Sequence, residues 1–279
     1  MRKSIKMAVF AGAACACMAG AGVSVKAADK VAINEKNFAP AVMEYAQNAD
    51  TNEDGFLSSK EASKVKKMRF DTRQYIDSFQ GVKYFTGLKK FIYEVAEYQQ
   101  DMTAAPDLDL SGMDKLEKVT IYSESMHIGT INLQDCTNLQ QLALIPDSEH
   151  MIYVDGINLR GCTNLDSFIC GGQTDQIDLS GLKKLEDVMF TGETETLNLD
   201  RCSKLKNIYI ISDTLKTLSL KGVRKLKGIT VKAPSLESLD LSKNKKLKNV
   251  NCHYTQITSL DLSGNKDLKY LHCQNNRKL

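Results

Sequence analysis

The sequence lacks the residue patterns on which most enzymes depend. Only four histidines occur in 279 residues, and none stands in a metal-binding or catalytic-triad pattern. It contains neither a nucleophile motif nor a phosphate-binding loop. His272 is adjacent to Cys273, but alternation along an extended segment sends these two side chains to opposite faces. We therefore expect no catalytic activity.

The first 27 residues differ from the rest of the chain. Three basic residues lie within the first six, residues 7–25 are apolar or small, and Val25-Lys26-Ala27 fits a small-x-small cleavage site. This order predicts a secretory signal peptide cleaved near Ala27, and hence a secreted or cell-surface protein with no membrane span in the mature chain. A membrane helix, or a lipoprotein modified at Cys15 or Cys17, fits the run less well.

The mature chain also lacks a net charge that would indicate its partners. Removing residues 1–27 leaves 33 basic and 34 acidic residues, a net charge of −1. That value hides an asymmetry, because residues 28–200 carry −13 and residues 201–279 carry +12. The overall balance indicates no class of partner, whereas the asymmetry can, and we expect no nucleic-acid partner.

A leucine frame repeats through most of the chain. Leu262 has counterparts back to Leu110 at intervals of 20 to 26 residues, and each is followed six residues later by another leucine. The eight pairs are Leu110/Leu116, Leu133/Leu139, Leu159/Leu165, Leu179/Leu185, Leu199/Leu205, Leu220/Leu226, Leu241/Leu247 and Leu262/Leu268. A period in this range predicts a solenoid. We number each repeat from its first leucine, position 0.

Two parts of each repeat alternate between apolar and polar residues. Apolar residues stand at −2 and 0 and again at +9 and +11, which predicts two short extended segments per repeat. Glycine at +2 in five repeats predicts a turn between them, and the polar column at −1, mostly Asp or Asn, is expected to serve turns and solvent. Stacking the repeats would bury each apolar column.

Six cysteines follow the signal peptide, and they share the spacing of the repeat. Three stand at +3 and three at +11: Cys136, Cys162 and Cys202, and Cys170, Cys252 and Cys273. Six cysteines in an exported protein would suggest three disulfides. These positions are core positions, however, where a free thiol packs as a small hydrophobe. We predict free thiols, and a bridge between stacked neighbours such as Cys252 and Cys273 stays open.

Residues 50–61, DTNEDGFLSSKE, match the calcium-loop pattern D-x-[DN]-x-[DN]-G-x5-E at every defined position. The expected Ca²⁺ ligands are side-chain oxygens of Asp50, Asn52 and Asp54, the Phe56 carbonyl, Ser58 directly or through water, and both carboxylate oxygens of Glu61. An acidic turn that holds no ion is the alternative. The loop resembles those of EF-hands and dockerins. Dockerins have two such loops and this chain one, so we expect a structural calcium clip.

Helices are expected on both sides of this loop. Apolar spacing predicts one over residues 37–48, and Ser58 to Glu61 form a capping box for a second that continues through Val65 and Met68. Residues 79–93 form a degenerate opening repeat, and no Ser/Gly-rich linker separates it from the helices. The calcium hand should therefore pack on the repeats as their N-terminal cap. The expected divisions are a signal peptide at 1–27, a calcium module at 28–70, an opening repeat at 71–107 and repeats at 108–279.

The clearest repeats resemble the leucine-rich repeat. Residues 268–276, LKYLHCQNN, fit L-x-x-L-x-L/C-x-x-N, and residues 257–265 fit it again. With a signal peptide, a calcium hand and 21-residue repeats, residues 28–279 are similar to secreted internalin-like proteins of bacteria. The resemblance implies a curved parallel-strand solenoid of about eight repeats, used for binding. The family would lead us to expect a polar C-terminal cap and a wall-anchoring tail, and neither follows Asn276.

Two surfaces are candidate ligand sites. Lysines on either side of the second leucine should stack into a basic stripe: Lys204, Lys206, Lys225, Lys227, Lys246 and Lys248. This stripe is either a track for an anionic polymer or, as we favour from sequence alone, a solvated face. Outward residues of the second extended segment are candidate protein or sugar contacts, with ordinary strand surface as the alternative: Tyr209, Asn249, Asn251, Tyr270 and His272.

The sequence thus predicts an exported, monomeric, non-enzymatic binding protein. Its leucine-rich-repeat surface would recognise a protein or a cell-surface or wall glycan, and Ca²⁺ would stabilise its cap. The alternative is a calcium-dependent, dockerin-like assembly module, in which the single hand pairs with another chain.

Overall fold

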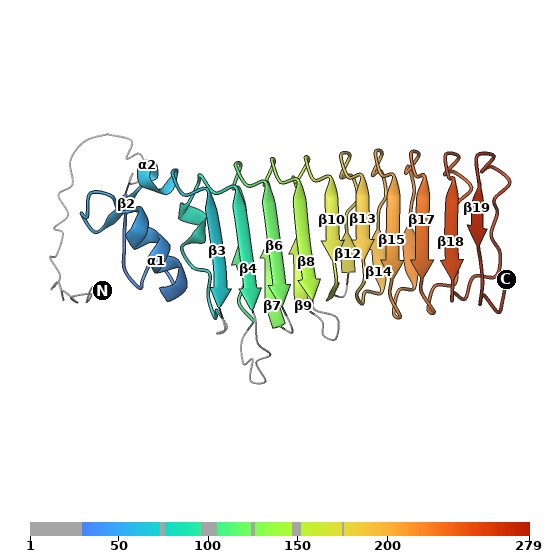
Figure 1. Ribbon diagram of the computed structural model, residues 1–279, viewed down its shortest axis with the longest axis horizontal. Coiled ribbons are helices and arrows are strands. Elements are labelled where there is room, and N and C mark those ends of the chain that lie inside the picture. The colour runs from blue at the N-terminus through green and yellow to red at the C-terminus, as the bar shows by residue number, and fades with distance from the viewer. Residues whose placement is uncertain (1–29, 73–75, 96–104, 124–125, 147–151, 175) are drawn as a thin grey trace, which may run out of the picture.

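The protein is an elongated solenoid with a small helical cap at its N-terminal end, as a computed structural model shows (Figure 1). The structure describes residues 30–279 except 73–75, 96–104, 124–125, 147–151 and 175. The expected signal peptide and its cleavage site lie outside these residues. Among the helices that are described, none has the length and apolar character needed to cross a membrane.

A parallel sheet of ten strands runs the length of the described solenoid. Its strands, in spatial order, are β3 (Lys67–Thr72), β4 (Lys90–Val95), β6 (Lys118–Ser123), β8 (Gln141–Pro146), β10 (Ser167–Cys170), β13 (Asp187–Phe190), β15 (Asn207–Ile211), β17 (Gly228–Lys232), β18 (Asn249–His253) and β19 (Tyr270–His272). The last eight carry position +9 of the eight repeats, and all of these except β19 also carry +11. The expected parallel solenoid of about eight repeats is confirmed.

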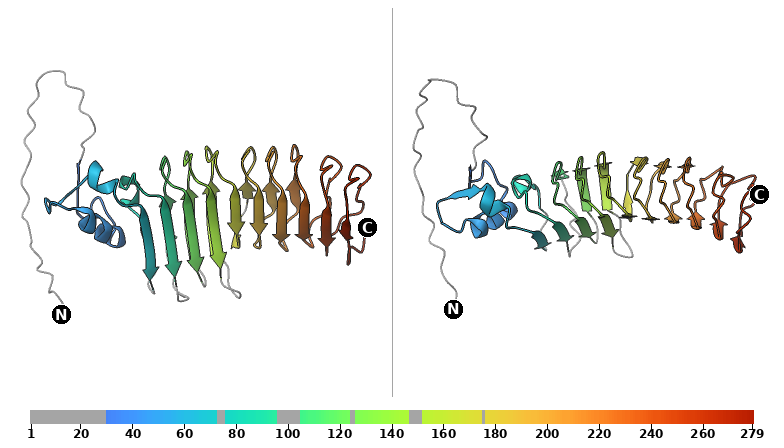
Figure 2. Two further views of the ribbon diagram at one scale, coloured as in Figure 1. Left: turned by 45° about the horizontal axis from the view of Figure 1, so that its top comes forward. Right: turned by 90° about the horizontal axis from the view of Figure 1, so that it is seen from above.

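The first extended segment of each repeat forms a second layer behind this sheet (Figure 2). β5 (Leu108–Asp109), β7 (Met126–Asn132), β9 (Ile152–Asn158) and β11 (Gly172–Gln173) make one parallel sheet. β12 (Gln176–Asp178), β14 (Thr196–Asn198) and β16 (Thr217–Ser219) make another. In the last two repeats, within the described residues, this segment forms no strand. The prediction of two strands per repeat therefore holds for six of the eight.

Identical repeat positions stack on one another and form the core. The parallel register pairs Val188 with Ile208 and Ile208 with Ile229, all at +9. Leucines at 0 and +6 are at most 7% exposed in the first seven repeats, and both are half-buried in the last. Because each column is continuous, an apolar residue at the same position of every repeat is enough to fill the interior over the whole length.

The turn at +2 requires the left-handed backbone conformation in the first six repeats. Four of these residues are glycines, such as Gly112 at φ 70° and Gly222 at φ 80°, but Asp135 and Arg201 adopt it at φ 60° and 61°. A side chain in this region normally costs about 1 kcal/mol relative to glycine. The polar column at −1 supports the turn, since Asp178 accepts from Ser180 N at 2.9 Å and Asp261 from Ser263 N at 2.9 Å. Its expected role in turns is confirmed.

All six cysteines of the described chain are free, and five are fully buried. Those at +3 donate their thiols to the carbonyl at position 0 of the preceding repeat, as Cys162 does to Leu133 at 3.0 Å. In the last two repeats +3 is asparagine, and the buried Asn265 donates to the Asn244 carbonyl at 2.8 Å. The sulfur atoms of Cys252 and Cys273 lie 3.3 Å apart, within reach of a thiol hydrogen bond, and form no disulfide. The packing role predicted for the cysteines is confirmed.

The cap consists of two helices and a two-stranded antiparallel sheet. α1 (Pro40–Ala49) begins with proline at its first position, and α2 (Ser59–Ala62) begins with the expected capping box. β1 (Lys30–Ala32) pairs with β2 (Phe56–Ser58), which belongs to the acidic loop. Aromatic side chains join the cap to the repeats, since the Phe70 ring contacts both Tyr45 on α1 and Phe91 on β4.

The second helix is shorter than predicted. It ends at Ala62, and Met68 lies in β3 with no exposed surface, so the prediction that the helix continues through Val65 and Met68 is wrong. Met68 and Phe70 take the place that Phe91 and Tyr93 take in the next strand. Tertiary stacking on β4 thus overrides the local helical spacing. β3 also crosses residue 70, where the sequence places a division between the calcium module and the opening repeat.

The cap protects the first edge of the long sheet. The Tyr45 hydroxyl donates to the Arg69 carbonyl at 2.7 Å and accepts from the Arg69 N–H at 2.8 Å. One side chain thereby satisfies both backbone groups that Arg69 presents at the open edge of β3. Unpaired groups on an edge strand would otherwise be available to another chain.

Replacing Tyr45 with Phe should lower the free energy of unfolding by about 1 kcal/mol, because two backbone hydrogen bonds are lost while the ring still packs. Urea titration followed by circular dichroism measures this. Tyr122→Phe, which removes an exposed hydroxyl, should change stability by less than about 0.5 kcal/mol. Equal effects of the two substitutions would contradict the role of Tyr45.

The buried thiols should be unreactive in the folded protein. Burial raises the pKa of Cys136 and Cys202 to about 11 and that of Cys162 and Cys170 to about 12, so little thiolate exists at neutral pH. With Ellman's reagent the half-buried Cys273 should react first, and the five buried thiols only after denaturant is added. Rapid native reaction of several thiols would show that the repeats do not stack as described.

Candidate functional site

The exposed face of the ten-stranded sheet carries two rows of side chains, at +8 and +10. Parallel register places Asn207, Gly228, Asn249 and Tyr270 in the +8 row, one on each successive strand. Tyr209, Thr230, Asn251 and His272 form the +10 row in the same way. The residue type changes from repeat to repeat at both positions, so this face presents varied side chains on a constant backbone frame.

These rows line a hollow of about 570 Å³ that extends from β10 to β19. It brings together all five residues predicted as ligand contacts: Tyr209, Asn249, Asn251, Tyr270 and His272. Tyr209 is 39% exposed and Tyr270 69%. At +10 of the two preceding strands, Thr120 and Ala143 are each 1% exposed, so the accessible face begins at β10.

The chemistry of the hollow changes along its length. Toward β10 its floor is apolar, with Ile169 and the 46% exposed Met189 leading to Tyr209. Toward β19 it presents the amides of Asn249 and Asn251. Sequence reasoning missed Ile169 and Met189, because it sought polar and aromatic types. Their position at +10, in register with Tyr209, is the signal that would have found them.

The predicted basic stripe lies along the edge of this hollow. Lys204, Lys225 and Lys246 stand at +5 and are exposed, and Lys227 and Lys248 stand at +7 and are also exposed. Lys206, also at +7, is half-buried and lies 2.5 Å from Glu186 on the preceding repeat. Each +7 lysine directly precedes a residue of the +8 row, so the stripe and the hollow are continuous.

Backbone hydrogen bonds shape the acidic loop at 50–61. Asp50 accepts from the N–H groups of Asp54 and Gly55, at 3.2 and 2.8 Å, and Asp54 accepts from Phe56 N at 3.0 Å. Gly55 adopts φ 78°, as the sharp turn requires, and Leu57 is 2% exposed as the expected apolar anchor. The structure thus shows a turn held by its own carboxylates, with the glycine and the apolar anchor at the positions that the sequence indicates.

Glu61 closes the loop through hydrogen bonds to protein groups. One carboxylate oxygen accepts from Thr51 N at 3.0 Å, and the other from the Ser58 N–H and hydroxyl at 3.1 and 2.6 Å. The bonds from Ser58, followed by those from Thr51, lower the pKa of Glu61 to about 2. In the described residues no group of three His, Cys, Asp or Glu side chains is placed to hold a metal. Both Glu61 and Asp54 are instead engaged by groups of the protein, Ser58 and Thr51 for the first and Lys30 for the second.

Strand β1 braces the loop from within the same chain. Val31 pairs with Leu57, and Ile33 N donates to the Gly55 carbonyl at 3.0 Å. The Lys30 ammonium forms an ion pair with Asp54, and their hydrogen bond raises the pKa of the lysine and lowers that of the carboxyl. β1 thus pairs with one edge of β2 and ties the loop to the preceding residues of the same chain.

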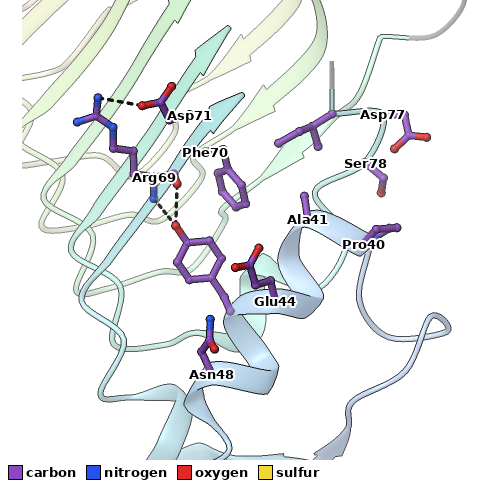
Figure 3. Close-up of a pocket in the computed structure, with 11 residues that line it drawn as sticks. Pro40, Ala41, Glu44, Asn48, Arg69, Phe70, Asp71, Asp77 and Ser78 are labelled. Carbon is purple, nitrogen blue, oxygen red and sulfur yellow. Dashed lines mark hydrogen bonds and ion pairs between the residues drawn. The ribbon is translucent and has the colours of Figure 1, made fainter. Parts of the chain in front are cut away.

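A second hollow, of about 640 Å³, lies between α1 and the first strand of the solenoid (Figure 3). Glu44 and Asn48 line it from the helix, and Arg69 and Asp71 from β3. Arg69 is bound to both Asp71 and Glu94, at 3.5 and 2.5 Å. Arg69 and Asp71 are therefore paired within the chain, where the cap meets the solenoid.

One polar pair escaped prediction altogether. His127 Nε2 lies 2.7 Å from Asp155 Oδ1, on the neighbouring strands β7 and β9 of the second layer. The two residues are 28 positions apart within stretched repeats, where the leucine frame gives no register. His272, by contrast, lines the main hollow, and Cys273 beside it contacts Cys252.

Comparison with known proteins yields structural likeness only. No family model matches the chain, and no curated protein has a significantly similar sequence. Among solved structures, the functional domain of InlJ from Listeria monocytogenes, described as including a cysteine ladder, is 16% identical with a TM-score of 0.36. The match covers 92% of this chain and 64% of that one. The internalin InlF of the same species is 12% identical with a TM-score of 0.34, over 86% of this chain and 85% of its own.

Proposed function

We propose that this chain is an exported, non-enzymatic binding protein whose leucine-rich-repeat surface recognises a protein or a glycan, with Ca²⁺ stabilising the N-terminal cap. The observation that carries the proposal is the hollow on the ten-stranded sheet, where six successive strands contribute to one accessible surface. A rigid sheet that presents variable side chains on an extended face is the arrangement that solenoid proteins use for binding.

The side chains in the hollow support recognition. Tyr209 and Tyr270 offer flat apolar faces with a hydroxyl, and Met189 adds a polarisable apolar surface. The amides of Asn249 and Asn251 can each donate and accept hydrogen bonds. A mainly apolar floor with a few polar groups provides both contact area and orientation.

The proposal of an exported protein rests on the signal-peptide pattern of residues 1–27. An extracellular location also suits calcium, since free Ca²⁺ outside cells is high enough to fill sites with Kd near ~10⁻⁴–10⁻³ M. The donors of the loop support a calcium clip, because Asp50, Asn52 and Asp54 each offer a side-chain oxygen, the ligand atom that this hard cation requires. When bound, the ion would link the loop to α2 through Glu61.

The dockerin-like assembly alternative has less support. Strand β2 of the loop is already paired with β1 of the same chain. The cap also packs on its own solenoid through Tyr45 and Phe70. We therefore favour a monomer in which calcium acts on stability.

Ligand binding should depend on the tyrosines of the hollow. After a ligand is found by screening glycan and protein arrays with and without Ca²⁺, Tyr209→Ala and Tyr270→Ala should each weaken binding about tenfold, as expected for exposed aromatic contacts. Titration calorimetry measures the affinity. Tyr153→Ala is the matched control, because Tyr153 is 45% exposed on the second layer. Binding that fails only in the control would place the ligand site on the other face.

Calcium removal should destabilise the monomer. At a tenfold excess over Kd, bound Ca²⁺ adds about 1.4 kcal/mol to the free energy of unfolding, so chelation should lower the melting temperature by the corresponding amount. Glu61→Gln should abolish this response, whereas Glu53→Gln, at a loop position with no ligand role, should keep it. Calorimetry measures the melting temperature, and light scattering measures whether the chain stays monomeric. Dissociation of a dimer on chelation would support the assembly alternative instead.

A further inference from the structure

The residues at +7 form a continuous column along one edge of the solenoid. Lys206 N donates to the Glu186 carbonyl, Lys227 N to Lys206, Lys248 N to Lys227 and Lys269 N to Lys248, each at 2.8 Å. These backbone bonds hold successive +7 residues about one strand spacing apart, ~4.8 Å. The side chains of the four lysines thus leave the backbone at evenly spaced points along a line of about 14 Å.

The same column carries the opposite charge earlier in the chain. It reads Glu117, Gln140, Asp166 and Glu186 before the first lysine. Where the sign changes, opposite charges pair, since Lys89 lies 2.6 Å from Glu117 and Lys206 lies 2.5 Å from Glu186. Beyond Lys206 the column contains only lysines. In the described chain Lys227, Lys248 and Lys269 form no ion pair with an acidic residue.

A solubilising surface does not require this arrangement. Alternating acids and bases would keep the edge equally hydrated and would attract one another, whereas stacked lysines repel. The exposed Lys225 and Lys246 at +5, with Arg224 and Lys245 at +4, add further positive charge to the same turns. The fold therefore keeps like charges together at a cost in stability, which favours a ligand that neutralises them.

The lysine column also borders the hollow directly. Lys227, Lys248 and Lys269 are followed by Gly228, Asn249 and Tyr270, which line it. We call these three lysines the rim. A polymer lying along the solenoid axis would rest on the floor of the hollow and turn its anionic groups toward the rim.

We propose that the hollow and its rim bind a linear glycan polymer that carries sulfate or phosphate groups, aligned with the long axis of the solenoid. The inference rests on the proposed binding function and specifies the class of ligand. Asn249 and Asn251 fit sugar hydroxyls, and Tyr209 and Tyr270, at the two ends of the rim segment, fit the apolar faces of sugar rings. Between the strands of the two tyrosines, β17 and β18 carry only Gly228, Thr230, Asn249 and Asn251 in these rows, and none of them offers an aromatic platform for successive bases.

The test measures binding of the full chain to heparin, to dextran phosphate and to neutral dextran over a range of salt concentrations. Binding to at least one of the two anionic polymers should weaken as salt rises, and dextran should bind at least tenfold more weakly. The ratio of the two anionic affinities identifies sulfate or phosphate as the preferred group. Lys227/Lys248/Lys269→Gln should weaken binding at least tenfold and reduce its dependence on salt.

A charge-matched control separates the rim from general attraction. Lys36/Lys83/Lys183→Gln removes three exposed lysines elsewhere and should keep wild-type binding. Because the rim lysines repel one another, the rim variant should melt at or above the wild-type temperature at low salt, so weaker binding cannot result from misfolding. Equal loss in both variants, an unchanged rim variant, or equally tight binding of single-stranded DNA would overturn the proposal.

The outcome also separates this inference from the function on which it rests. If neither anionic polymer binds while Tyr209→Ala still weakens binding of another array ligand, the binding function stands and the polymer proposal fails. If the hollow variants affect no ligand, both fail.

Discussion

The structure depends on one constraint, the parallel backbone register that places each repeat position directly on its equivalent in the next repeat. From this register, leucines at 0 and +6 become continuous buried columns, and cysteines at +3 meet the carbonyl of the preceding turn. The same constraint acts outside the core. A lysine that recurs at +7 becomes a charged row, and variable residues at +8 and +10 become a single surface. A residue type that recurs at one repeat position thereby becomes a continuous row along the molecule.

The repeat array was predictable because its information is local and periodic. The leucine offset of six, the Asp or Asn at −1 and the cysteines in core positions each report their own environment without knowledge of the fold. β3 was not predictable in this way. Its two inward residues, Met68 and Phe70, carry no leucine frame and follow a capping box, so a helix was the better local prediction. Only contact with β4 makes this segment a strand.

The candidate site, like the fold, has a part that the sequence predicts and a part that only the structure reveals. Spacing alone identified the loop at 50–61 and five residues of the hollow, since each is defined by position in a pattern. It did not reveal that Glu61 bonds to Ser58 and Thr51, or that β1 pairs with the loop, because these contacts join segments with no shared period. Met189 and Ile169 were missed because their residue type indicates a core, and only register shows that they face outward.

The change of sign along the +7 column has a consequence at longer range. The described residues of 30–200 hold 15 basic and 22 acidic side chains, or −7, those of 201–279 hold 17 and 5, or +12, and the solenoid places the two groups at opposite ends of a rod. Such a molecule has a large electric dipole moment along its axis despite a net charge near zero. In the field of an anionic surface it experiences a torque before contact, and its C-terminal half turns toward that surface. Approach would then be oriented, with the hollow and its rim arriving first and the cap directed away into solvent.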